Sequence, residues 1–288
     1  MILEIAITAL IPSLVAVGVF FALRRYGPGA ASRSTALPLA LGLGYLAGHL
    51  GVGGTPPWPP VTSTQSLFYL VVAALIAAVT LARVKALWLR SAVRLVLLAG
   101  ILGLILRAMV RYQWQPLEAA LWLVGLATFT WVLWSAHLRS LERGRSRAQP
   151  LAWCLSLSGC GVALVLAHSA LLAQLSFVLV AVVASVYAVT LREPESPRLS
   201  LAVPVLLTIQ VSLLLSGTFY ADLAAYQAIG LAVAPLGVIL AELRPKSSDR
   251  TRLVLGLLGV ALILVPLLGV AAVEYSTMGG DSYGYDEE

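Results

Sequence analysis

Apolar stretches recur along the whole of this 288-residue chain, and several are as long as the ~20 residues that an α-helix needs to cross a bilayer. Composition agrees with this pattern, since 60% of the residues are hydrophobic and only 11% are charged. An average soluble domain has about 25% charged residues, because its surface must be hydrated. The sequence therefore excludes an ordinary soluble fold and predicts an all-α, polytopic bundle of transmembrane helices.

The apolar stretches divide into about ten predicted crossings, each ended by charged residues, proline or a polar cluster. The predicted crossings are residues 5–23, 36–53, 65–82, 87–110, 117–138, 151–169, 171–191, 201–219, 223–241 and 253–273. The longest loops between them hold about a dozen residues, too few to bury a hydrophobic core of their own. Residues 1–273 are therefore predicted to form one multi-pass membrane domain, with no soluble domain.

The boundary between the sixth and seventh crossings has no charge to mark it, because no charged residue lies between Pro150 and Arg192. A single helix over that stretch would be about 60 Å long, which is about twice the thickness of the hydrocarbon core. We therefore predict two helices joined by a tight turn within residues 168–174.

Lysine and arginine residues test this topology independently, because cytoplasmic loops collect them. With the N-terminus outside, every lysine and arginine except Arg107 and Arg111 falls in or beside one of five predicted inner loops. Most acidic residues fall on the other side, including an acidic tail at residues 274–288 that we predict to be disordered. The chain is thus predicted to lie in a plasma (inner) membrane with both termini extracytoplasmic.

The polar residues inside the predicted crossings are few, and this narrows the function classes. No Asp or Glu lies at mid-depth in any predicted crossing, which argues against carriers coupled to protons or sodium, since such carriers commonly use buried carboxylates. The chain contains no recognisable catalytic motif, so we predict that it is not an enzyme and has no cofactor. Basic residues are spread over five loops, which argues against nucleic acid as a partner.

Arg107 and Arg111 depart from the inner-loop trend and form one candidate binding site. They lie four residues apart at the outer end of the fourth crossing, so both side chains share one helix face. Paired guanidinium groups suit phosphate or carboxylate groups, which predicts anion capture at the outer mouth. The alternatives are snorkelling to the interface and ion pairing with Glu118 or Asp222.

Three further polar residues are candidates for binding. His49 and His168 lie at similar predicted depth near the outer ends of the second and sixth crossings, an arrangement compatible with a bis-imidazole haem or a quinol site. The alternative is that each histidine hydrogen-bonds to water or backbone. Gln210 lies at mid-depth in the eighth crossing, where its amide either bonds to a neighbouring helix or lines a pathway.

Glycine and proline positions predict how the helices pack and where they bend. Gly44 and Gly48 have the spacing that lets two helix backbones approach closely. Pro235 and Pro266 interrupt the last two crossings near mid-depth, which predicts kinks at both positions.

These observations leave three function classes. The first is a non-catalytic subunit or scaffold that packs against other membrane proteins, and the scarcity of buried polar groups slightly favours it. The second is a carrier or channel for a neutral, lipid-like or anionic solute, which would use Arg107, Arg111 and Gln210, with Pro235 and Pro266 as flexible points. The third is a haem- or quinol-binding membrane protein. In every case the lipid bilayer is a partner.

Overall fold

The structure of the protein is a computed structural model that describes residues 6–27, 30–143, 148–191, 199–243 and 248–280. These residues form helices joined by turns and loops, with no strand among them. The α-helices are α2 (Ile11–Tyr26), α3 (Ala30–Gly53), α4 (Ser63–Arg83), α5 (Leu87–Ile105), α6 (Arg107–Tyr112), α7 (Pro116–Arg143), α8 (Ala148–Leu166), α9 (Ala170–Thr190), α10 (Val203–Tyr220), α11 (Ala225–Val233) and α12 (Asp249–Gly280). The other helical segments are the π-helix η1 (Ala6–Leu10) and the 3-10 helices η2 (Leu199–Leu201) and η3 (Ala234–Leu243).

Nine helices in the described part of the chain are long and apolar enough to cross a membrane, which confirms the predicted fold class. The predicted ninth crossing is different, because residues 223–241 divide into α11 and η3. Pro235 explains the division: it has no N–H to donate to the carbonyl of Leu231, so the α-helical hydrogen-bond ladder fails there. Because a 3-10 helix rises ~2 Å per residue, α11 and η3 together still reach about 33 Å, enough for the hydrocarbon core.

The turn between α8 and α9 confirms the division predicted for the charge-free stretch. α8 ends at Leu166 and α9 begins at Ala170. His168, between them, has a φ of 57°, a left-handed conformation that is uncommon for residues other than glycine. This conformation reverses the chain within a tight turn.

The predicted end of the fourth crossing at residue 110 is wrong. α5 ends at Ile105, and Leu106, with φ −91° and ψ 7°, separates it from the short helix α6. The hydroxyl of Tyr220 donates to the carbonyl oxygen of Ile105 at 2.6 Å. This hydrogen bond holds the break between α5 and α6 against the end of α10.

α12 corrects the prediction for the C-terminal tail, since the helix continues beyond residue 273 to Gly280. Glu274 supplies a reason, because its carboxylate accepts hydrogen bonds from the hydroxyl of Tyr226 at 2.7 Å and from Nε2 of Gln227 at 2.9 Å. The prediction of disorder is therefore wrong for residues 274–280, and residues 281–288 lie outside the described part.

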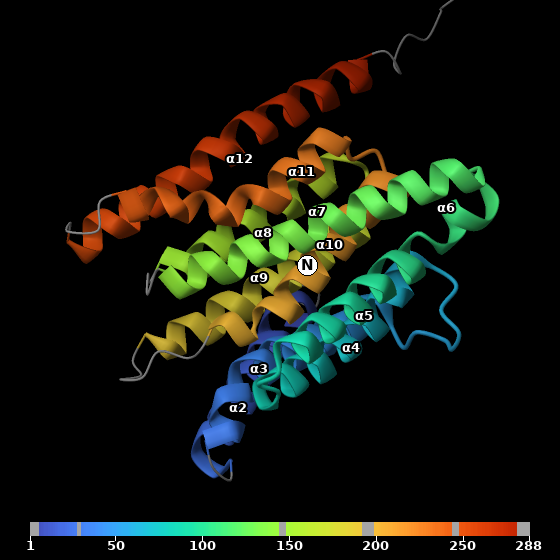
Figure 1. Cartoon of the computed structure of the whole chain (residues 1–288). Coiled ribbons are helices and arrows are strands. Elements are labelled where there is room, and N and C mark those ends of the chain that lie inside the picture. The colour runs from blue at the N-terminus through green and yellow to red at the C-terminus, as the bar shows by residue number, and fades with distance from the viewer. Residues whose placement is uncertain (1–5, 28–29, 144–147, 192–198, 244–247, 281–288) are drawn as a thin grey trace, which may run out of the picture.

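α10 lies at the centre of the bundle, and nearly all of its residues are buried. In Figure 1, α2 to α5 lie on one side of it and α12 on the other.

Gly44 and Gly48 of α3 confirm their predicted role in close packing. A Cβ at Gly44 would lie 2.7 Å from the Cβ of Ala16 on α2, and a Cβ at Gly48 would overlap Val178 on α9.

The loops predicted to lie outside gather at one end of the bundle, which we call the predicted outer end. The backbone N–H of Asp222 donates to the carbonyl of Ala167 at 3.4 Å, which joins the α10–α11 loop to the α8–α9 turn. The ring of His168 lies 5.3 Å from the ring of Tyr275 on α12. These contacts agree with the predicted alternation of helix directions, while the side of the membrane that this end faces stays a prediction.

Candidate functional site

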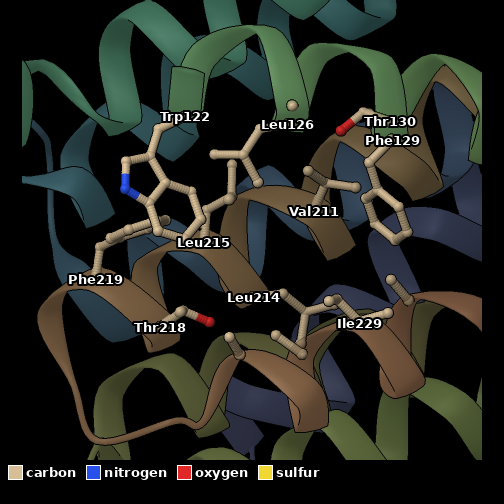
Figure 2. A pocket seen from close by; sticks show the side chains of 14 residues that line it. Trp122, Leu126, Phe129, Thr130, Val211, Leu214, Leu215, Thr218, Phe219 and Ile229 are labelled. Atoms are coloured by element: carbon tan, nitrogen blue, oxygen red, sulfur yellow. The ribbon is translucent and has the colours of Figure 1, made fainter. Parts of the chain in front are cut away.

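An apolar groove of about 250 Å³ lies between α7, α10 and α11 (Figure 2). Its lining residues are Trp122, Gly125, Leu126, Phe129 and Thr130 of α7, Val211, Leu214, Leu215, Thr218 and Phe219 of α10, and Ala225, Ala228, Ile229 and Ala232 of α11. Two threonine hydroxyls and one indole N–H are the polar side-chain groups in this set. The groove is therefore suited to a hydrocarbon chain rather than to an ion or a sugar.

The groove exists because small residues line its walls on two helices. Ala225, Ala228 and Ala232 lie three and four residues apart, so their methyl groups form one face of α11. On α7, Gly125 lines the groove without a side chain, and a Cβ at this position would meet no atom within 4 Å. Among residues 116–129 of α7, Ala119 alone is buried, and the other core contacts of this half of the helix come from partly buried side chains such as Leu123 and Leu126.

The groove opens away from the core of the bundle. Its floor is buried, since Leu214 and Leu215 of α10 are 4% and 7% exposed. Its rim is exposed, since Trp122 of α7 is 41% exposed and Ile229 of α11 is 52% exposed. The groove therefore opens on the outer surface of the bundle.

Three aromatic rings close the end of the groove that lies at the predicted outer end of the bundle. Trp122 is stacked on Trp114, with ring centroids 6.0 Å apart and an interplanar angle of 13°. Phe219 meets both rings edge-on, with its centroid 5.3 Å from that of Trp114 and 5.5 Å from that of Trp122. Figure 2 shows Trp122 and Phe219 at this end and Phe129 toward the other. Tryptophan at this depth is typical of the interface between headgroups and hydrocarbon.

The hydroxyl of Thr218 is the polar atom that the fold leaves unsatisfied in the groove. It is buried and makes no hydrogen bond, although a buried hydroxyl without a partner costs about 1–3 kcal/mol. Thr218 lies two residues before the end of α10, next to the aromatic end of the groove. Rotation of the Thr218 side chain toward the groove would let a ligand with a hydrogen-bonding group satisfy this hydroxyl.

Arg107 and Arg111 lie on α6, close to the aromatic end of the groove. Both side chains are exposed, and the guanidinium carbon of Arg111 lies 5.4 Å from the ring centroid of Tyr112. The predicted alternative of ion pairing is not found, because no described ion pair joins either arginine to Glu118 or Asp222. Asp222 instead lies 3.5 Å from Nδ1 of His168.

Gln210 is fully buried, and its amide bonds to two neighbouring helices rather than lining the groove. Its Nε2 donates to the carbonyl of Leu231 on α11 at 2.9 Å and contacts Oγ of Ser156 on α8 at 3.1 Å. The hydroxyl of Ser156 donates to the same carbonyl at 3.0 Å. This is the carbonyl that Pro235 leaves without an α-helical donor, so two side chains replace the missing backbone hydrogen bond.

The structure does not bring His49 and His168 together. His49 is buried on α3, with its ring centroid 5.6 Å from that of Phe68. His168 is half exposed and contacts Asp222 and Tyr275. The two histidines share no contact, so this geometry offers no support for the bis-imidazole hypothesis.

The groove escaped the sequence analysis, which singled out none of its lining residues as a binding site. One signal was present, namely the spacing of Ala225, Ala228 and Ala232 in the short ninth crossing. Small residues at such spacing more often mark close helix packing.

Comparison with known proteins finds no matching family, no matching curated protein and no matching solved structure. The function is therefore argued from the groove itself.

Proposed function

We propose that this protein is a carrier for a lipid-like solute, and that the groove between α7, α10 and α11 receives the apolar chain of that solute. The observation that supports this proposal is an apolar groove with a buried floor and an exposed rim, positioned to open toward the bilayer. A solute already dissolved in the hydrocarbon would enter it sideways, without crossing water.

The groove has a volume of about 250 Å³, which suits a hydrocarbon chain. A dry cavity of ~150 Å³ in a protein core binds benzene. The groove is therefore large enough for a chain segment longer than one aromatic ring.

The exposed surface of the bundle gives no specific support to the subunit hypothesis. α12 presents an apolar stripe that includes Val254, Leu258, Leu262 and Val265. Lipid chains cover such a surface as well as a partner helix does, because hydrocarbon is as apolar as leucine. The groove is different, because an unfilled space leaves the atoms that line it without contact partners. An occupant whose shape fits the groove restores those contacts.

Filling the groove tests the proposal. We expect Gly125→Leu to abolish crosslinking of a diazirine-bearing phosphatidylcholine to Leu214 and Leu215 on the buried floor of the groove in liposomes, because the new side chain would occupy the space of the chain. A Cβ at Gly125 meets no atom within 4 Å, so the substitution is expected to leave the fold intact. Peptide mapping by mass spectrometry measures the labelled sites.

Gly103→Leu is the matched control, because Gly103 lies on α5, is exposed and has equally open space around it. This variant is expected to keep full labelling. Undiminished labelling in the Gly125→Leu protein would contradict the groove as a lipid site.

The transport step is tested in proteoliposomes that contain fluorescent phosphatidylcholine. Dithionite added outside reduces only the lipid of the outer leaflet, so wild-type protein is expected to accelerate the loss of fluorescence by bringing lipid from the inner leaflet. A labelled groove without such acceleration would contradict the carrier.

A further inference from the structure

The position of α6 relative to the groove indicates which lipid-like solute would bind. Tyr220 donates a hydrogen bond to Ile105 at 2.6 Å, and its neighbour Phe219 lines the aromatic end of the groove. Arg107 begins α6 two residues after Ile105. The first turn of α6 is therefore held beside the end of α10 at which the groove closes.

The charges of Arg107 and Arg111 are available to a ligand. Leu106 and Met109 are buried against the bundle, whereas both arginines are exposed on the other side of the helix. No carboxylate of the described residues pairs with either arginine, and Asp222, one of the two acids expected to do so, lies beside His168. Residues four apart on a helix have Cβ atoms about 6 Å apart, so the two guanidinium groups can bind one anionic group.

We propose that the solute is an anionic phospholipid, with its acyl chain in the groove and its phosphate at Arg107 and Arg111. This inference rests on the proposed function, since the groove must first accept a chain. Guanidinium groups bind phosphate oxygens in a bidentate manner. Thr218, whose hydroxyl has no partner, lines the aromatic end of the groove, where rotation of its side chain lets the hydroxyl donate to the ester carbonyl that joins acyl chain and headgroup in a phospholipid.

A lipid with both groups explains three features together. The apolar groove accounts for the chain, the buried hydroxyl of Thr218 for an acceptor near the interface, and the two arginines for a negative charge beyond it. A free phosphate ion would use only the arginines, and an uncharged lipid would use only the groove. The anionic phospholipid is the occupant whose chemistry matches all three.

The test compares two photoreactive lipids with the same diazirine-bearing chain, phosphatidylglycerol and phosphatidylcholine, in liposomes that hold the full-length protein. Wild-type protein is expected to crosslink phosphatidylglycerol about thirtyfold more strongly at Leu214 and Leu215 on the buried floor of the groove, since the two arginines near a membrane surface together contribute ~2 kcal/mol toward an anionic lipid and 1.4 kcal/mol is a factor of about ten. Arg107→Gln with Arg111→Gln is expected to reduce this preference to about one, with labelling by phosphatidylcholine unchanged. That unchanged labelling also shows that the variant is folded.

The control variant is Arg83→Gln with Lys85→Gln, which removes two exposed basic side chains from the opposite end of the bundle and is expected to keep the preference. If the double arginine variant does not fold, Arg107→Gln alone is expected to lose part of the preference. A wild-type preference near one, or a preference that survives loss of both arginines, would overturn the anionic assignment and leave the groove proposal intact. Loss of groove labelling by both lipids in the wild-type protein would instead refute the proposed function.

Discussion

Gly259→Ala is expected to destabilise the bundle by about 1–3 kcal/mol or more, as overpacking of a dense core does. A Cβ at Gly259 would overlap the carbonyl oxygen of Gly237, and a Cβ at Gly237 would lie 2.5 Å from the carbonyl carbon of Gly259. The atoms in the way belong to backbone, which cannot rotate aside as a side chain does. η3 and α12 can therefore pack this closely only with glycine at both positions.

Gly269→Ala provides the matched control, because Gly269 lies on the same helix and a Cβ there would meet no atom within 4 Å. Alanine exceeds glycine in helix propensity by about 1 kcal/mol, so this variant is expected to be neutral or more stable. Thermal unfolding in detergent, followed by tryptophan fluorescence, measures the difference. For a protein of this size the Gly259→Ala variant should unfold several degrees lower, at ~2–4 °C per kcal/mol. Equal melting temperatures for the two variants would contradict backbone contact between η3 and α12.

The close packing of η3 on α12 also indicates which wall of the groove moves. Gly230 on α11 continues the seam, since a Cβ there would overlap Leu267 of α12. α12 therefore packs closely against the face of α11 that points away from the groove. The half of α7 before Phe129 buries little of its surface, and segments with few buried contacts open at low free energy cost. We expect α7 to be the wall that moves when a chain enters.

The fold class could be predicted because the length of an apolar stretch is a local property. A bilayer requires helices of similar length and no exposed backbone, so length and charge placement alone predict most of the crossings and a turn close to the observed turn between α8 and α9. Gly44 and Gly48 were also predictable, since their role depends on spacing within one helix. None of these inferences needed knowledge of which helices are neighbours.

The groove could not be predicted, because it depends on which faces of three helices meet. Gly125 and Ala228 are unremarkable in their own helices, and they create a cavity only because α7 and α11 both line the space above α10. The partner of Asp222 was missed for the same reason. In the sequence Asp222 has no feature that favours His168 over Arg107 or Arg111, and the choice follows from where the α8–α9 turn lies.

The hydrogen bonds of Gln210 were predictable in part. A mid-depth amide needs partners in hydrocarbon, so a bond to a neighbouring helix was expected, but Ser156 could not be identified as one of them. The position of Pro235, four residues after Leu231, was the overlooked signal. A proline inside a helix leaves the carbonyl four residues earlier without a donor, and a buried carbonyl of that kind needs a side chain to replace it.

Gln210→Leu combined with Ser156→Ala is therefore expected to destabilise the protein by more than the sum of the two single substitutions. Either single variant leaves one donor on the carbonyl of Leu231, and interhelical hydrogen bonds in membranes average only ~0.6 kcal/mol. The double variant leaves that carbonyl bare in a buried site, which costs about 1–3 kcal/mol. Melting temperatures of the four proteins measure the coupling between the two positions.

Pro235→Ala sharpens this test, because it restores an N–H four residues after Leu231. Added to the double variant, it is expected to recover part of the lost stability, since a backbone donor again reaches the carbonyl. Pro266→Ala, which removes the proline inside α12, is the control and is expected to give no such recovery, because its N–H would serve a different carbonyl. Additive losses in the double variant, or equal recovery by both proline substitutions, would show that the Leu231 carbonyl is not what Gln210 and Ser156 stabilise.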